Sequence, residues 1–268
     1  MRDVIAVANH KGGVGKTASA VNLAATLVLD GKRVLLVDLD PQGSASLSFG
    51  ITDTGHALLS AMEHTTGLPI QTTTMEGLDL VVAGAELAEA RYRFSGEIGA
   101  EILRRCLQRT DGDWDFIFLD CPPSDELLTT GALRASHWLL IPVEAHFLGL
   151  RGLDQMLDTV ATQARHNPGL SILGVLPCRA HPRRRIHSEV LEQLEVILPG
   201  RIGPTIRENV ALAEAPARGI PAVVAARRSN AALDYRAAAD WLMQRIRDAA
   251  QPKLVREASV SSAHKQAL

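Results

Sequence analysis

The sequence predicts an α/β fold in which a mostly parallel, twisted sheet carries helices on both faces. Short apolar runs recur along the chain and are separated by longer amphipathic segments, the order expected of parallel strands joined by crossover helices. Several of the apolar runs end in acidic residues or in a glycine-rich turn. Open α/β sheets place their ligands at the carboxyl ends of the strands, so we expect a binding site where these runs end.

Strands are expected where a short apolar run is bounded by turn signals. The first begins at Val4 and leads directly into a glycine-rich turn, and the second is followed by an aspartate, Asp38. A run that starts at Trp114 also closes on an aspartate, Asp120. The expected strands are residues 4–8, 33–37, 78–82, 114–120, 137–143 and 171–176.

Helices are expected where apolar residues recur at intervals of three and four. In the first of them Val21, Ala24, Ala25 and Val28 share one face, and Gly31 just past its end is a helix stop. The expected helices are residues 18–30, 56–62, 95–109, 149–165 and 230–250.

A single domain is expected over residues 1–250, because 268 residues with 46% hydrophobic and 22% charged side chains can build one sizeable core. Residues 251–268 are polar and poor in core residues, so we expect a disordered tail. No apolar run approaches the roughly 18 residues that span a bilayer, and the chain starts with a strand, not a signal peptide. Three cysteines at wide spacing argue for reduced thiols, so we expect a cytoplasmic protein without a membrane partner.

The glycine-rich turn after the first strand has the pattern of a phosphate-binding loop. It spans residues 9–17, reads NHKGGVGKT, and lies between an expected strand and an expected helix. Small residues let successive backbone N–H groups turn inward, and the positive end of the following helix adds to the field on an anion. Lys16 would reach the β- and γ-phosphates of a nucleotide, and the Thr17 hydroxyl would bind Mg²⁺. The expected nucleotide-binding residues of the loop are Lys11, Gly12, Gly13, Val14, Gly15, Lys16, Thr17 and Ala18.

Three aspartates at strand ends are expected beside this loop. Asp38 and Asp40 are two residues apart, so the strand's period puts both on one side, where they would face the γ-phosphate and its metal. Asp120 is suited to hold Mg²⁺ through a water. Thr17, Asp38 and Asp120 are therefore the expected metal-binding residues. The structural alternatives are a solvated Asx turn before Pro41 and an aspartate that only ends a strand.

The loop departs from the general pattern G-x-x-x-x-G-K-[ST], because its first position is His10 and a second lysine, Lys11, follows. Written K-G-G-V-G-K-T, it resembles the loop of the ParA/MinD group of P-loop ATPases. D-x-D-P at 38–41 and D-C-P-P-S at 120–124 match the same group, as do E-A-P at 214–216 and G-x-P at 219–221. The resemblance is to ParA/Soj-type chromosome and plasmid partitioning ATPases, and it covers about residues 3–248.

The resemblance implies a P-loop NTPase fold, ATP and Mg²⁺ as cofactors, and an ATPase that is weak without its partner. It also implies that Asp40 positions or activates the attacking water. Lys11 is expected not to curl back onto its own γ-phosphate but to reach the nucleotide of a second copy in an ATP-dependent sandwich homodimer. A ParB-like centromere-binding partner would stimulate hydrolysis, and the dimer would associate with the nucleoid through nonspecific double-stranded DNA to move plasmid or chromosome.

Positive charge is concentrated in the C-terminal half of a chain whose net charge is −2. Residues 176–228 hold nine arginines and five glutamates, a balance of four positive charges. Arginine contacts to phosphates give DNA affinity without sequence preference. The alternative is a solvated face with local ion pairs, and Glu208 and Ala211 stand where relatives often carry arginine. The expected DNA-binding residues are Arg207, Arg227 and Arg228, followed by Arg183, Arg184 and Arg185.

Three rival functions use the same loop. A MinD-like protein that positions other cargo would need a basic amphipathic terminal helix, and residues 251–268 have no wide apolar face. An electron carrier of the nitrogenase-reductase type would need Cys121 and Cys178 to hold a cluster between subunits. A metabolic ligase is a further possibility, against which the E-A-P segment argues.

Overall fold

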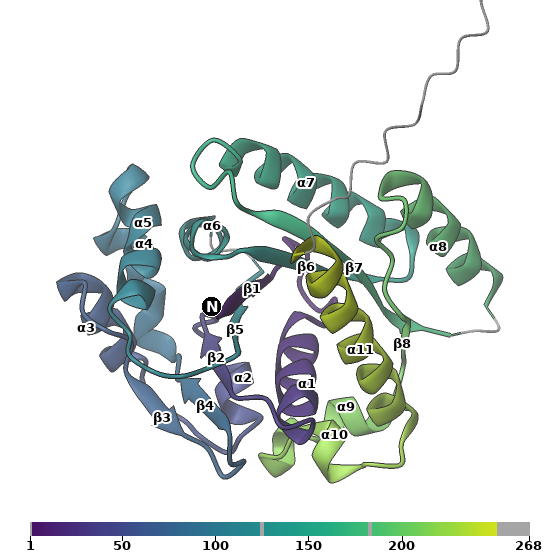
Figure 1. Cartoon of the computed structure of the whole chain (residues 1–268), viewed down its shortest axis with the longest axis horizontal. Helices are drawn as coiled ribbons and strands as arrows, with labels where there is room; N and C mark the ends of the chain where they lie inside the picture. Colours follow the sequence, from purple (N-terminus) through teal and green to yellow (C-terminus); the bar gives the residue numbers. More distant parts are fainter. Residues whose placement is uncertain (1, 124–125, 182–183, 251–268) are drawn as a thin grey trace, which may run out of the picture.

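The computed structural model describes residues 2–123, 126–181 and 184–250. The tail expected at residues 251–268 and the candidate Arg183 lie outside these described residues. Within the described part, eight strands form one sheet in the order β3-β4-β2-β5-β1-β6-β7-β8, and only β3 runs antiparallel to its neighbour (Figure 1). The strands are β1 (Asp3–Val7), β2 (Val34–Asp38), β3 (Ile70–Thr72), β4 (Leu78–Val81), β5 (Phe116–Asp120), β6 (Trp138–Glu144), β7 (Ser171–Ala180) and β8 (Ile206–Arg207). The predicted fold class is confirmed.

Helices cover both faces of the sheet, as the alternation of apolar and amphipathic segments predicts (Figure 1). One face packs against α1 (Lys16–Leu29), α2 (Ser44–Leu47), α10 (Ala222–Ala225) and α11 (Asn230–Ala250). The other face packs against α3 (His56–His64), α5 (Gly96–Gln108), α6 (Glu126–Ala135), α7 (Phe147–Gln163) and α8 (Arg185–Ile197). The short elements η1 (Ala85–Glu89), α4 (Ala90–Arg93), α9 (Val210–Glu214) and η2 (Pro216–Arg218) lie in the connections.

The central strand β1 is apolar throughout its buried part because it faces a core on each side. Val4 and Ala6 belong to the core under α5 and α7, whereas Ile5 and Val7 belong to the core under α1 and α11. Side chains of a strand alternate between the two faces of a sheet, so each core takes every second residue. A strand buried in this way is a continuous apolar run, which is why its position could be predicted.

The strand order places the carboxyl ends of β1, β2 and β5 side by side. In the parallel register Val7 lies opposite Asp120, and Asp38 lies opposite Asp120 on the other side of β5. The glycine-rich turn that follows β1 therefore comes next to the aspartates that end β2 and β5. This edge of the sheet carries the candidate site.

Several elements were not predicted from the sequence. Helix α6 contains Gly131 and two threonines, which lower its local helical signal. Helix α6 packs against α5, and this long-range contact is not visible in the local sequence. Strand β7 also runs to Ala180, past the expected end at Leu176, because β8 pairs with its last residues. Among the described residues, no helix is both long and apolar enough to cross a membrane.

Candidate functional site

The turn between β1 and α1 has the backbone of an anion-binding loop. Gly13 and Gly15 have φ angles of 74° and 97°, a left-handed conformation that glycine adopts without strain. Gly15 is the residue before the first turn of α1, and Ser19 donates its backbone N–H to the Gly15 carbonyl at 2.8 Å. The N-terminus of α1 is thus open to a ligand at this point, which suits a phosphate.

Lys16 points back along the loop. Its Nζ atom donates to the Lys11 carbonyl at 3.0 Å, and the residue is only 6% exposed. Burial lowers the pKa of Lys16, against the opposing attraction of Asp120 and Asp40. A lysine with few competing waters is well placed to bind a phosphate oxygen.

Asp38 is fully buried at the end of β2, where its carboxylate receives three hydrogen bonds. The Ser46 backbone N–H and hydroxyl both donate to Oδ2 at 2.8 Å, and the Asp40 N–H donates to Oδ1 at 3.1 Å. Burial raises the pKa of Asp38 to about 6, although the bonds from Ser46 act in the opposite direction. Asp38 therefore holds the start of α2 against the strand, in addition to any part in metal binding.

Asp120 is equally buried, but neither of its carboxylate oxygens has a partner at full hydrogen-bond geometry among the described residues, although the Thr17 hydroxyl is close enough to act against the rise of its pKa. Burial, reinforced by the charge of the adjacent Asp38, raises the pKa of Asp120 well above its ordinary value. A buried carboxylate without a partner is costly unless a cation compensates it. The orphaned oxygens of Asp120 therefore fit a Mg²⁺ held directly or through a water.

Asp40 stands at the boundary between the sheet edge and open space. Its Oδ1 accepts the Gln42 backbone N–H at 2.9 Å, which is the Asx turn considered as the structural alternative. Asp40 also lines the cavity beside the loop. The same side-chain position therefore serves both the turn and the candidate catalytic role. A second hollow of about 820 Å³, lined by Asp40, Pro122 and Pro123, lies on its other side.

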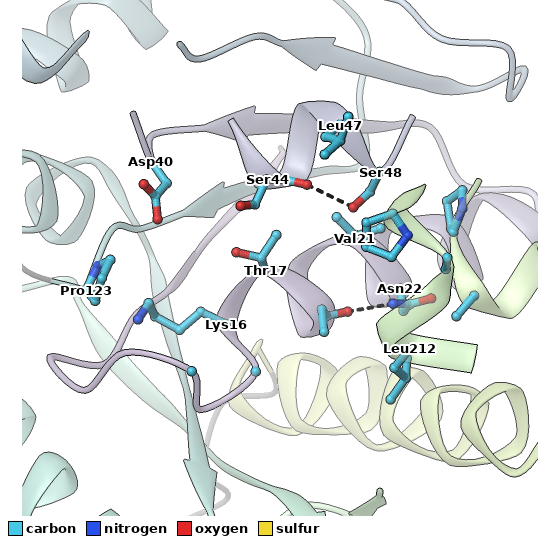
Figure 2. A pocket seen from close by; sticks show the side chains of 17 residues that line it. Lys16, Thr17, Val21, Asn22, Asp40, Ser44, Leu47, Ser48, Pro123 and Leu212 are labelled. Carbon is cyan, nitrogen blue, oxygen red and sulfur yellow. Dashed lines mark hydrogen bonds between the residues drawn. The ribbon is translucent and has the colours of Figure 1, made fainter. Parts of the chain in front are cut away.

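A cavity of about 390 Å³ opens beside the N-terminus of α1. Figure 2 shows Lys16, Thr17 and Asp40 around one end of it, with Leu212 at the other end. Its far wall comes from the distant E-A-P and G-x-P segments, which supply Ala215, Pro216, Pro221 and Ala222. The two signatures that lie far apart in the sequence thus line one space.

Lys11 is held away from the cavity of its own loop. Its Nζ atom lies 3.1 Å from Glu144 Oε2 and 2.9 Å from His146 Nε2, and these two residues are 2.8 Å apart. Burial acts to raise the pKa of Glu144, but the hydrogen bonds from Lys11 and His146 outweigh it and lower that pKa. The end of β6 therefore holds the Lys11 ammonium group at the surface.

Sequence reasoning missed the residues that fasten the loop to α7 and β6. Asn9 donates its amide to the Pro142 carbonyl at 2.8 Å and accepts the Lys11 N–H at 3.0 Å. His10 Nε2 lies 2.7 Å from the Thr159 hydroxyl. A Cβ at Gly152 would lie 2.8 Å from Asn9 Oδ1, so this glycine lets α7 approach the loop. In the sequence, only the regular spacing of apolar residues in the helix around Gly152 marks this region. That spacing does not reveal which residues contact the loop.

The candidate DNA-binding arginines differ in their surroundings. Arg207 is engaged with Asp234, which accepts from its Nε and Nη2 atoms, the latter at 2.6 Å. Arg227 and Arg228 are exposed and form no ion pair with a described residue. Arg185 pairs with a glutamate one helical turn away, and Arg184 is exposed at the start of α8.

Comparisons with known proteins agree with this geometry. A family model described as AAA domain matches residues 2–172. The sporulation initiation inhibitor protein Soj of Bacillus subtilis (strain 168) is 39% identical over 242 residues, which are 88% of this chain and 96% of that protein. The chromosome-partitioning ATPase Soj of Thermus thermophilus is 39% identical over 248 residues, 91% of this chain and 97% of that protein.

A solved structure extends the comparison to a protein with bound nucleotide. Cobyrinic acid a,c-diamide synthase from Mycobacterium smegmatis, with bound ADP and magnesium, matches with a TM-score of 0.74 at 32% sequence identity. The match covers 93% of this chain and 97% of that one. The similarity therefore extends over nearly the whole length of both chains.

Proposed function

We propose, because the chain belongs to the Soj/ParA family of partitioning ATPases, that ATP makes it pair with a second copy and that the pair binds double-stranded DNA without sequence preference. The chain is a partitioning or positioning ATPase that uses ATP and Mg²⁺. In our proposal a ParB-like centromere-binding protein stimulates hydrolysis, and the resulting ADP form leaves the DNA. Plasmid or chromosomal DNA on the nucleoid is then segregated or positioned by this cycle.

The residues around the loop divide the work of hydrolysis. The backbone N–H groups of residues 12–17 and the Lys16 ammonium group bind and orient the phosphates. Thr17 and Asp120, together with Asp38, would hold Mg²⁺, which supplies positive charge against the charge that develops on the phosphates. The Asp40 carboxylate, whose Oδ1 accepts the Gln42 N–H, orients the attacking water at the edge of the cavity.

The position of Lys11 is the observation that carries the proposal. A cation near the γ-phosphate greatly accelerates phosphoryl transfer, and P-loop enzymes that lack one are slow until it arrives from a partner. Lys11 Nζ is held by Glu144 and His146, and the Lys11 side chain is 30% exposed, on the outside of its own loop. From there it is available to a second copy that faces it. This arrangement supports a site that becomes complete only in the pair.

The DNA contact is proposed for the exposed arginines of the C-terminal half. Arg227 and Arg228 are adjacent, exposed and free of ion pairs with described residues, so their charge is available to phosphates. Arg207 contributes less, because Asp234 already neutralises its guanidinium group. Arg184 and Arg185 form a second, smaller group at the start of α8.

The test is a DNA mobility shift at low salt with ATP, with ADP and without nucleotide. We expect retardation with ATP alone, and a steep loss of binding as salt rises. The double change Arg227→Glu and Arg228→Glu should abolish retardation, while ATP-dependent pairing, followed by light scattering, persists. The control is Arg104→Glu with Arg105→Glu, an adjacent exposed pair on α5 at the opposite face of the sheet, in which Arg104 pairs with Glu101 at the surface. Equal retardation with ATP and ADP would remove the proposed switch.

A second candidate function follows from the name of the Mycobacterium smegmatis structure. A diamide synthase uses ATP to join a carboxylate to nitrogen, so its turnover would require an amide donor and an acceptor carboxylic acid. One assay distinguishes the two functions, because a partitioning ATPase hydrolyses ATP when only DNA and a partner protein are added. Hydrolysis that appears only with glutamine or ammonium and an acid acceptor would favour the synthase.

A further inference from the structure

Arg179, near the end of β7, has a backbone conformation that ordinary side chains avoid. Its φ angle is 55°, in the left-handed region, and among the described residues only Thr65 shares this feature without being glycine. Such strain persists when surrounding contacts enforce it, and it is concentrated at functional sites. Thr65 ends α3, far from the loop, where a left-handed residue is an ordinary helix termination. Arg179 instead lies where the pairing of β7 with β8 shifts register between Cys178 and Ala180, so its left-handed conformation belongs to a β-bulge, a feature that redirects a side chain.

The contacts of Arg179 place its guanidinium group beside the phosphate loop. Nη1 donates to the Gly13 carbonyl at 3.2 Å and lies 3.8 Å from Glu144 Oε1. Glu144 Oε2 holds the Lys11 ammonium group at 3.1 Å. One carboxylate is thus shared by two cations that flank the same loop. The Arg179 side chain is 54% exposed, so several of its five donors remain available.

We propose that Arg179 is a second cation which this chain presents to the triphosphate bound by a second copy, alongside Lys11. The strained backbone and the Gly13 carbonyl hold the guanidinium group outside its own loop, on the side where Lys11 is also held. Glu144 is the positioning residue for both. The inference rests on the proposed function, because it requires two copies that face each other through their loops.

The first experiment separates the guanidinium group from the backbone strain. Arg179→Ala and Arg179→Gly both remove the cation, but only glycine also relieves the strain. We expect both to lower the kcat of ATP hydrolysis by about 10-fold or more with little change in KM for ATP, since the lost contact strengthens in the transition state. The glycine variant should unfold about 2–4 °C above the alanine variant.

Thr65→Ala and Thr65→Gly are the matched controls. They should show the same difference in unfolding temperature, with kcat unchanged, because Thr65 has the same backbone strain away from the loop. Arg179→Lys should retain part of the activity, because it keeps the charge but not the planar group of donors. Wild-type kcat in both Arg179→Ala and Arg179→Gly would overturn the proposal.

The second experiment decides whether Arg179 acts on the nucleotide of the other copy. An Asp40→Ala chain keeps its Arg179 but cannot orient the attacking water, and an Arg179→Ala chain has the opposite defect. In a mixed pair, the Asp40→Ala chain supplies Arg179 to the intact site of its partner. Each mixed pair should therefore regain up to about half the activity of a wild-type pair, well above either variant alone. An arginine that acts on its own loop gives no recovery in the mixture, and that result would overturn the inference.

The same mixing experiment with Lys11→Ala tests the proposed function separately. Recovery with Lys11→Ala but not with Arg179→Ala would leave the paired site intact and reject only the role of Arg179. No recovery in either mixture would reject both. Recovery of activity in both mixtures supports two cations that act across the pair.

Discussion

Replacing Asp120 by asparagine should stabilise the protein in the absence of nucleotide and Mg²⁺. Asp120 is fully buried beside Asp38, and its oxygens have no partner among the described residues. Asp38 gives the scale of the effect. Its pKa rises from the ordinary 3.8 to about 6 even with three hydrogen bonds, which corresponds to about 3 kcal/mol of destabilisation at pH 8.

For Asp120, burial outweighs the Thr17 hydroxyl and the Lys16 ammonium group, which act to lower its pKa. On the scale set by Asp38, removal of the charge should gain about 3 kcal/mol, a rise of about 6–12 °C in Tm at pH 8. The gain depends on pH in a defined direction. A carboxyl group whose pKa is raised on folding binds its proton more tightly in the folded chain than in the unfolded chain. It therefore destabilises the folded chain once the pH rises above the pKa that the group has in the unfolded chain. The advantage of Asp120→Asn should therefore be largest at pH 8 and shrink towards pH 5.

The assay is thermal unfolding of Asp120→Asn and wild type at pH 5 and pH 8, with and without Mg²⁺ and ATP. Asp113→Asn is the control, because the Asp113 side chain is 93% exposed and its ion pair with Arg33 lies at the surface, where such pairs contribute little. Ligand should raise the wild-type Tm more than that of the variant, because the variant lacks the carboxylate that fits the cation. An unchanged or lower Tm for Asp120→Asn at pH 8 without ligand would refute the reasoning.

Three further predictions concern packing around the site. Gly152→Ala should lower ATP hydrolysis by about 10-fold or more, because its Cβ would displace the Asn9 side chain that orients the loop; an unchanged kcat would contradict this. Asn22→Ala should lower the free energy of unfolding, measured by chemical denaturation, by about 1–3 kcal/mol, because the buried Val223 N–H loses its acceptor. A smaller loss would indicate that a water replaces the Asn22 side chain as acceptor. All three cysteines are buried, and burial raises the pKa of Cys106 to about 11, so mass spectrometry should find no maleimide labelling of the folded chain at pH 8.

Local pattern was sufficient to predict the elements with strong periodicity. Strand β1, helix α1 and the loop between them lie within a few residues of the expected positions, because an apolar run, three glycines and an amphipathic face are all encoded locally. The ends of β2 and β5 were also predicted, since each apolar run closes on an aspartate. Helix α6 and strand β8 were not, because their positions depend on packing against α5 and pairing with β7.

The sequence by itself determined the phosphate loop, the acidic strand ends and the α/β architecture, because these follow from residue type and spacing. Only the tertiary structure decided which side chains meet. It paired Arg207 with Asp234, used Asp38 to hold α2, and brought Lys11 and Arg179 to the one carboxylate of Glu144. Within the part of the chain that the structure describes, it left the oxygens of Asp120 without a full hydrogen bond. Such pairings join residues up to 133 positions apart, and their energies depend on burial and distance, which no local pattern specifies.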